Sequence, residues 1–491
     1  MQNLHDILKG ISSSLLHLIP EGALMIGFFV LLVAGMINNQ RNILFASITL
    51  ATSLTSILLI AGNHLSSVHS IANGMLIRDG GADFIMLLVD VSVALTCLLS
   101  LRNAPRRHRS EFYAFLLAVA AGCHFLVMSN NLVMVFVSLE LVSITSYVLA
   151  GYAFDRHGSE GSFKYFLFGS VASAAMLYGF SLIFGITGTL DFTSPSFISA
   201  IIEHSTPLLF IAALFALAGF LFKMAAVPMQ SWAPDVYQAA PIPVIAYFSV
   251  APKVAALWIL ARFTVALHGY GQSGYDWQSV VAGIAVLTIL AGNLSALWQK
   301  DSKRMMAYSS IAHSGFLLVG LAAFMPQGVE FMLFYAAVYL LMNYGVFALL
   351  LGFEREGVSG AMTTFSGAGP RRVWAAAGLT FGMIALAGIP PTGGFTAKLF
   401  VFTSLWQSYL ESGKVFLLVL LVVGLVNTVI SLFYYLRIPW YAWFRAGELP
   451  AQEKNGAFEN FLGLILVLGV VVIFFLPGLL MGLMNKINFV L

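Results

Sequence analysis

Three lysines and one glutamate lie deep inside apolar stretches of this sequence. Glu140 stands between leucines, Lys223 ends a run of apolar residues, Lys253 directly follows a proline, and Lys398 comes shortly after a pair of prolines. A lysine at the centre of a membrane helix costs about 3 kcal/mol on insertion scales. Since carboxylates and amines both exchange protons, groups kept at this cost are candidates for proton transfer.

Glu140 and Lys223 are interpreted as partners in a switchable ion pair. Burial disfavours a charged amine, whereas a nearby carboxylate favours it. Moving Glu140 away would therefore release the proton of Lys223, which we expect to pass by water toward Lys253, His313 and Lys398. The alternatives are a neutral carboxyl or a helix–helix contact for Glu140, a structural ion pair for Lys223, and an interfacial position for Lys253.

Other polar residues in the apolar stretches have weaker functional interpretations. His313 titrates near neutrality and suits a proton relay, with a hydrogen-bonded packing role as the alternative. His124 and Asp90 are as easily structural as functional. Asp235 is expected to accept bonds from amides near a helix break, and Arg262 is expected to extend its charged end toward the outer membrane interface.

Composition excludes a soluble globular protein. Of the 491 residues, 59% are hydrophobic and only 9% are charged, and the mean hydropathy is +0.90, whereas soluble proteins carry about 25% charged residues. The net charge of +3 is too small and dispersed for nucleic-acid binding. Cys97 and Cys123 stand in separate apolar runs, so the cysteines predict no disulfide framework, metal site or iron–sulfur cluster.

The apolar runs predict an all-α polytopic membrane protein. They are continuous and about twice as long as barrel strands, so we expect helices, because backbone groups in lipid must bond internally. The fourteen segments are 14–37, 42–62, 82–102, 112–128, 131–152, 162–188, 206–227, 241–268, 277–298, 305–324, 329–353, 373–409, 415–438 and 459–484.

The basic residues between these segments predict the topology, because cytoplasmic loops are enriched in lysine and arginine. One set of alternating loops holds Arg41, Arg102, Arg106, Arg107, Arg109, Arg156, Lys164, Lys300, Lys303, Arg304, Arg355, Arg371, Arg372, Arg437, Arg445 and Lys454. The opposite side holds only Lys9, Arg78, Lys414 and Lys486. We therefore expect both termini on the outer side, which an even number of helices also requires.

Two of the predicted helices contain breaks. Pro228 interrupts one after Lys223, and Pro390 and Pro391 interrupt the other before Lys398; proline removes an amide donor from a helix. Discontinuous helices in two halves of a chain are typical of a transport path. The sequence Ala-Leu-Ala-Gly recurs at 216–219 and 385–388, which favours an inverted repeat. The expected domains are a three-helix segment over 1–110, a core over 111–440 with repeats near 111–270 and 275–440, and a last helix within 441–491.

Several motifs resemble one known family. They are Phe-Lys-Met-Ala-Ala-Val-Pro at 222–228, Trp-Ala-Pro-Asp-Val-Tyr-Gln-Ala-Ala-Pro at 232–241, Lys-Arg-Met-Met-Ala-Tyr-Ser-Ser-Ile-Ala-His at 303–313, Ser-Leu-Glu-Leu at 138–141 and Gly-Ile-Pro-Pro-Thr-Gly-Gly-Phe at 388–395. Over about 80–440 the chain resembles the antiporter-like membrane subunits of respiratory complex I, and the second motif is similar to the subunit N group. One departure is Gln230, where the family often has histidine.

The resemblance implies a proton-translocating subunit of NADH:quinone oxidoreductase with site residues Glu140, Lys223, Lys253, His313 and Lys398. It implies no cofactor in this chain, with NADH, flavin, iron–sulfur clusters and quinone in partner subunits. The implied partners are other complex I subunits, above all a neighbouring antiporter-like subunit, and membrane lipids. The implied location is the bacterial inner membrane rather than a plastid membrane. The alternatives are a subunit of a multisubunit Na⁺/H⁺ antiporter and a structural membrane scaffold.

Overall fold

The computed structural model describes residues 14–37, 41–62, 68–104, 108–272, 274–358, 360–447 and 456–489. The predictions for Lys9, Arg106, Arg107 and Lys454 lie outside these residues. The chain divides into two compact units. The first contains residues 1–224, 251–277 and 486–491, and the second contains residues 225–250 and 278–485.

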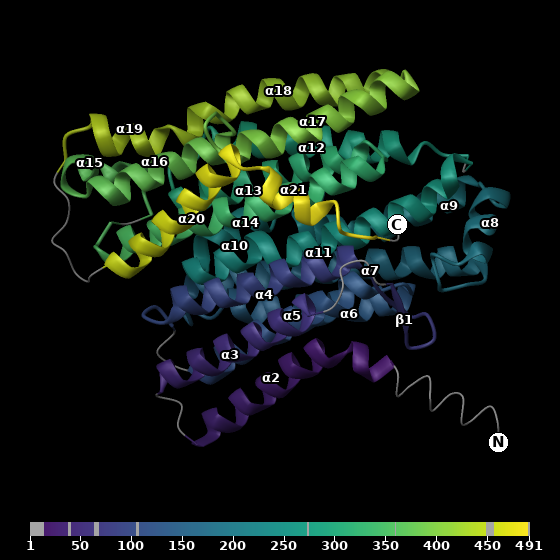
Figure 1. Cartoon of the computed structure of the whole chain (residues 1–491), viewed down its shortest axis with the longest axis horizontal. Helices are drawn as coiled ribbons and strands as arrows, with labels where there is room; N and C mark the ends of the chain where they lie inside the picture. The colour runs from purple at the N-terminus through teal and green to yellow at the C-terminus, as the bar shows by residue number, and fades with distance from the viewer. Residues whose placement is uncertain are drawn as a thin grey trace. The chain divides into compact units, whose positions relative to one another are not determined.

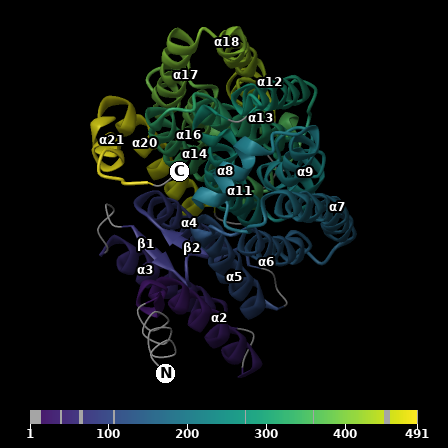
Figure 2. The same ribbon diagram turned by 90° about the vertical axis from the view of Figure 1, so that its right-hand side faces the viewer.

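The first unit is built from helices, with one short hairpin at an end of them (Figure 1). Its helices are α2 (Ile19–Ile37), α3 (Asn42–Ala61), α4 (Gly80–Ser100), α5 (Arg109–Met128), α6 (Leu132–Ala150), α7 (Arg156–Thr187), α8 (Pro195–Glu203), α9 (Pro207–Met224), most of α11 (Ile242–His268) and η1 (Gly269–Gly271). Strands β1 (His69–Ile71) and β2 (Leu76–Arg78) pair antiparallel, with His69 opposite Arg78. Helices α2 to α5 lie side by side, and β2 contacts α5 (Figure 2).

The second unit holds the remaining helices. These are α10 (Ala233–Ala239), α12 (Trp277–Ala296), α13 (Ser302–Ala322), α14 (Pro326–Arg355), η2 (Met362–Phe365), α15 (Ala368–Arg371), α16 (Val373–Ala387), α17 (Gly393–Ser412), α18 (Val415–Tyr435), α19 (Arg437–Phe444), α20 (Ala457–Phe475) and α21 (Gly478–Met484). Helix α14 packs against α13, α16, α17 and α20. Helix α13, which carries His313, is buried along almost its whole length.

The predicted membrane helices are confirmed. Among the described residues, thirteen helices are long and apolar enough to cross a membrane, and they correspond to all predicted segments except 373–409. That segment is divided into α16 and α17. The β1–β2 hairpin between α3 and α4 was not predicted, because its strands are only three residues each. The domain boundaries near 110 and 440 and the inverted repeat stay predictions.

Both predicted helix breaks are present. Helix α9 ends at Met224, and the next residue, Ala225, has the positive φ of 54° that a non-glycine residue seldom adopts. Helix α16 ends at Ala387, and the next residue, Gly388, has a φ of 82°, which suits glycine because it has no Cβ. Proline follows both ends within a few residues, so neither helix continues. Lys223 lies just before the first break and Lys398 just after the second.

Candidate proton-transfer site

Lys223 lies in the last turn of α9 and is almost completely buried, with 1% of its surface exposed. Its Nζ donates to the hydroxyl of Tyr165 on α7 at 3.5 Å. The same Nζ lies 5.5 Å from the ring centre of Tyr165 and 5.8 Å from that of Tyr147. Aromatic faces attract a cation electrostatically, so these two tyrosines provide the surroundings of the charged amine.

Glu140 lies on α6, half-buried, on the same helix face as Ser143 and Tyr147, which follow it at spacings of three and seven residues. Among the described residues it is not within ion-pair distance of Lys223, whose Nζ bonds the Tyr165 hydroxyl instead, but its charge is close enough to act on the amine. In the described part of the chain its Oε1 is buried without a hydrogen-bond partner. The ring centres of Tyr147 on α6 and Tyr165 on α7 are 4.8 Å apart, and the rings meet edge to face. Aromatic side chains of both helices therefore lie beside the carboxylate and the amine.

Room for this arrangement depends on Gly169 of α7. A Cβ on Gly169 would meet the Tyr147 hydroxyl directly and would lie 3.0 Å from Cζ of Phe222. Phe222 neighbours Lys223 in sequence, and its ring lies 5.6 Å from that of Tyr165. A larger residue at position 169 would therefore displace the aromatic side chains next to the lysine.

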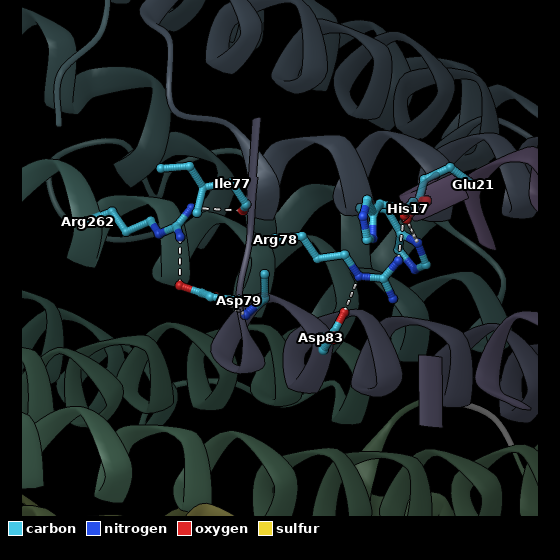
Figure 3. A network of polar contacts seen from close by, with 9 residues as sticks. His17, Glu21, Ile77, Arg78, Asp79, Asp83 and Arg262 are labelled. Carbon is cyan, nitrogen blue, oxygen red and sulfur yellow. Dashed lines mark hydrogen bonds and ion pairs between the residues drawn. The ribbon is translucent and has the colours of Figure 1, made fainter. Parts of the chain in front are cut away.

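Lys253 is buried in α11, next to Pro252 inside that helix, and belongs to the first unit. Arg262, further along α11, is buried, with 1% of its surface exposed. The expectation that it reaches the outer membrane interface stays a prediction. Arg262 Nη2 forms an ion pair with Asp79 at 2.7 Å, and its Nη1 donates to backbone oxygens of Val127 and Ile77 (Figure 3). A buried carboxylate that no sequence motif marked holds the arginine inside the protein.

His313 belongs to a hydroxyl cluster in the second unit. Its Nδ1 lies 2.9 Å from the Tyr335 hydroxyl of α14, and its Nε2 lies 3.2 Å from the Tyr435 hydroxyl of α18. The Tyr435 hydroxyl also bonds Ser309 Oγ at 2.5 Å. Both imidazole nitrogens therefore have partners that can donate or accept a proton.

A second line of hydroxyls passes beside the histidine. The Tyr237 hydroxyl of α10 lies 3.1 Å from Ser310 Oγ, which lies 2.9 Å from the Tyr339 hydroxyl. The sequence analysis missed all these tyrosines, because tyrosine is common in membrane helices. Their spacing carried a weak signal, since Tyr335 and Tyr339 are four residues apart and face the same side of a helix.

Lys398 binds the carbonyl groups that the second helix break exposes. Its Nζ donates to the oxygens of Ala387 at 2.8 Å and Leu386 at 3.3 Å, the last residues of α16. It also lies 4.3 Å from the ring centre of Phe316, whose ring is 6.1 Å from that of His313. A cation is favoured at the carboxyl end of a helix, and Phe316 lies next to both basic side chains.

An ion pair between α10 and α13 stabilises the segment after the first helix break, whereas the side chain of Gln230 does not. Asp235 Oδ1 binds Arg304 of α13 at 2.8 Å, and the same arginine bonds Gln238 at 3.0 Å. Gln230 Oε1 is buried without a hydrogen-bond partner among the described residues. Val227 N donates to Thr288 Oγ1 at 3.0 Å, which satisfies one amide near the break.

The predicted site residues therefore form two groups. The first unit contains Glu140 and Lys223, which lie near each other, and Lys253. In the second unit, the side chains of His313 and Lys398 both neighbour the ring of Phe316. Within the described ranges, no three His, Cys, Asp or Glu side chains come together in a way that could hold a metal ion. The chemistry that these groups offer is proton binding and transfer by amines, an imidazole, a carboxylate and hydroxyls.

Comparisons with known proteins agree with this geometry. The family model described as NADH:quinone oxidoreductase/Mrp antiporter, TM, matches residues 129–431. NADH-quinone oxidoreductase subunit N of Chlorobium chlorochromatii is 34% identical over 492 residues, which cover 96% of this chain and 95% of that protein. The chain belongs to the NADH-quinone oxidoreductase subunit N family.

Solved structures place this subunit N family member in a known fold. A chain of respiratory complex I from Thermus thermophilus, solved with bound aureothin, has a TM-score of 0.80 and 26% identity, covering 96% of this chain and 100% of that one. A chain of the Mrp complex from Dietzia sp. DQ12-45-1b also has a TM-score of 0.80, at 19% identity, covering 95% and 96%. The second likeness concerns the fold alone.

Proposed function

We propose that this chain is a proton-translocating membrane subunit of an NADH:quinone oxidoreductase, and that its buried basic residues carry the protons. The observation that carries the proposal is Lys223, a fully buried amine within range of a half-buried carboxylate and beside two tyrosines. Membership of the subunit N family supports the same function. The chain would hold no cofactor, and NADH oxidation and quinone reduction would take place in partner subunits.

In the first unit, Glu140 controls the proton of Lys223 from a distance. A carboxylate in a medium of low dielectric acts on an amine without direct contact, and Glu140 Oε1 has no hydrogen-bond partner to hold it within the described structure. A small shift of Glu140 therefore changes the energy of the charged amine. A change of two pKa units corresponds to about 2.7 kcal/mol, whereas moving one charge against 100 mV costs about 2.3 kcal/mol.

In the second unit, His313 and Lys398 form the other end of the path. The hydroxyls of Tyr335 and Tyr435 give the imidazole two routes for proton exchange. The carbonyl oxygens of α16 hold Lys398 by hydrogen bonds from its Nζ, and its proton would leave and return through water. Lys253 is a further proton carrier in this scheme, with water completing the path.

The remaining expectations belong to the same proposal. The chain would lie in the bacterial inner membrane with both termini on the outer side, next to another antiporter-like subunit. The two helix breaks would be corresponding parts of two inverted repeats. Each consists of a helix that ends in a residue of positive φ, followed by proline and a buried lysine nearby.

The experiment compares Lys223→Ala with Lys164→Ala in the assembled complex. Lys164 is a partly exposed lysine of the same unit that pairs with Glu160 on the surface of α7, so it controls for the loss of a positive charge. In reconstituted vesicles we expect Lys223→Ala to lower the number of protons moved per NADH, and Lys164→Ala to leave it unchanged. An unchanged number in an assembled Lys223→Ala complex would remove this lysine from the path.

A Na⁺/H⁺ antiporter subunit is the second candidate, because the fold is similar to a chain of the Mrp complex from Dietzia. It predicts sodium-dependent, NADH-independent proton movement and no copurification with quinone-reductase subunits. Purification of the chain with its native partners, followed by transport assays with and without sodium, distinguishes the two functions. A structural scaffold predicts that none of the buried lysines affects transport.

A further inference from the structure

A second group of buried titratable residues lies among the first helices of the chain, away from the residues discussed above. His124 of α5 has Glu21 of α2 at its Nδ1, 3.0 Å away, and Asp90 of α4 at its Nε2, 3.3 Å away. All three side chains are at most 1% exposed. We call Glu21, His124 and Asp90 the acid–histidine triad.

The acid–histidine triad carries more acidic than basic groups. One imidazole can neutralise only one of two carboxylates, and an uncompensated charge inside a membrane protein is costly. The nearby arginines do not supply the missing charge, because Arg78 pairs with Asp83 and Arg262 pairs with Asp79. The triad therefore needs one further positive charge, either a proton or a bound cation.

The elements packed against α5 carry few groups that could supply that charge. Helix α3 has none. The groups on α2, α4, α6 and β2, together with the cysteine next to His124, are Glu21, Asp83, Asp90, Cys97, Glu140, Tyr147, Arg78 and Cys123. Helix α11 also contacts α5, through Arg262 and the backbone oxygen of Val127, and this arginine pairs with Asp79. Arg78 is likewise already paired. Among the described residues, the cation within ion-pair distance of Asp90 is His124.

The geometry favours a proton over a metal ion. The two carboxylates contact opposite nitrogens of one imidazole ring, so a single ion cannot bind all three side chains. No group among the described residues has the arrangement of a metal site. Both oxygens of Asp90 and Oε2 of Glu21 are buried without hydrogen-bond partners in the described structure, and a proton or a water molecule would satisfy such atoms.

The two carboxylates differ in their surroundings. Glu21 lies in the first turn of α2, where the helix dipole favours a negative charge, and its Oε1 has a good hydrogen bond with the imidazole. Asp90 lies midway along α4, where the helix dipole does not stabilise a negative charge. Glu21 is therefore the anion that pairs with charged His124, and Asp90 is the group left to bind the extra proton.

Polar groups also connect the acid–histidine triad with the β1–β2 hairpin. Glu21 lies within electrostatic range of Asp83, which pairs with Arg78 of β2 at 2.6 Å. Arg78 Nη1 donates to the backbone oxygen of His17 at 2.6 Å, and Figure 3 shows His17 and Glu21 close together at this end. A path of polar side chains thus leads from the hairpin to Asp90.

We propose that the acid–histidine triad is a second proton-binding site, in which Glu21 and His124 form an ion pair and Asp90 takes up and releases a proton by way of the hairpin. The site stands on its own geometry and does not depend on the role of Lys223. Cys123, next to His124, lies within electrostatic range of both Asp90 and Lys223. If the proposed function of Lys223 holds, the charge of Asp90 therefore acts on the same region.

The test compares the whole purified complex with Asp90→Asn and Ser100→Ala. Ser100 is buried on the same helix and bonds only within it, to the oxygen of Thr96. Infrared difference spectra between acidic and alkaline buffer report protonated carboxyl groups. We expect Asp90→Asn to lose one carboxyl band and to release about one proton fewer per complex on alkalisation, since a carboxyl group carries a single proton. Ser100→Ala should match the wild type.

Other variants separate the possible outcomes. Glu21→Gln should move the loss of the Asp90 band to lower pH, because charged His124 then pairs with Asp90 in place of Glu21. If Asp90→Asn does not assemble, Asp90→Glu should keep a carboxyl band at a shifted frequency. An Asp90→Asn spectrum identical to that of Ser100→Ala would overturn the proposal, and so would a band that responds to sodium rather than to pH. Lys223→Ala should leave the band in place, so its effect on pumping is judged independently.

Discussion

The ion pair between Arg262 and Asp79 gives the sharpest test of the structure. Both side chains are at most 1% exposed, and removing one partner of a buried pair leaves an uncompensated charge at a cost of about 3–5 kcal/mol. Asp79 keeps one hydrogen bond, from Ala82 N at 2.8 Å at the start of α4. Arg262→Met should therefore destabilise the protein toward the lower limit, by about 3 kcal/mol.

A second substitution should restore most of this stability. Asp79→Asn removes the charge, and asparagine still caps α4 because its side-chain oxygen accepts the same amide hydrogen bond. The double variant Arg262→Met with Asp79→Asn should lie within about 1 kcal/mol of the wild type, since a neutral replacement for a buried pair is often tolerated.

The assay is thermal release of the subunit from the purified complex, with the free energies taken from a double-mutant cycle. The matched control is Arg156→Met, an exposed arginine at the start of α7 in the same unit. If Arg262→Met is as stable as Arg156→Met, the charge of Asp79 is not buried as described. If the double variant is no better than Arg262→Met alone, the loss comes from packing and the electrostatic argument is refuted.

Three further predictions concern single positions. Gly169→Ala should lower the number of protons moved per NADH, because the added Cβ displaces Tyr147. The control is Gly185→Ala on the same helix, whose added Cβ has nothing within 4 Å and should leave that number unchanged. The same number of protons per NADH in both variants would contradict the packing argument. Lys398→Gln should keep the hydrogen bonds to the carbonyl groups and assemble, but it should no longer pump protons. Lys398→Met should also lower the yield of assembled complex, because each lost hydrogen bond of the charged amine is worth about 1.5–3 kcal/mol. Full pumping by Lys398→Gln would exclude a role of this lysine in proton transfer. Burial, and then His69 and Arg78, lower the pKa of His17 below its ordinary value, so the folded protein binds this proton less readily than the unfolded chain. Stability should therefore rise with pH between the folded and the unfolded pKa of His17 and fall on acidification. The protection of the hairpin amides against hydrogen exchange, corrected for the intrinsic rate at each pH, should fall at acidic pH in the wild type but not in His17→Gln.

Much of the fold follows from hydropathy alone. Long apolar runs must become helices in lipid, so the membrane segments were predictable, and so were both breaks, because proline cannot continue a helix. The two short strands of the hairpin were not, since three-residue strands such as His69–Ile71 are too short for periodicity to identify.

The candidate site was predictable only in part. Charged residues in apolar runs stand out, which is why Glu140, Lys223 and Lys398 were found. Glu21 was missed because it lies at the end of an apolar run, where a carboxylate is unremarkable. The pairing of Arg262 with Asp79 was missed because the two residues are distant in sequence, and such pairing depends on tertiary packing.

The hydroxyl line of Tyr237, Ser310 and Tyr339 has a consequence for the direction of flow. Each hydroxyl is able to donate and to accept, and either oxygen can be the donor in both bonds of the line, so a proton that hopped along it would leave every hydroxyl turned the opposite way. The next proton can follow only after all of them swing back. Such a line of hydroxyls would transfer protons equally well in both directions. The direction of net transfer would have to be set by the charged groups at its ends.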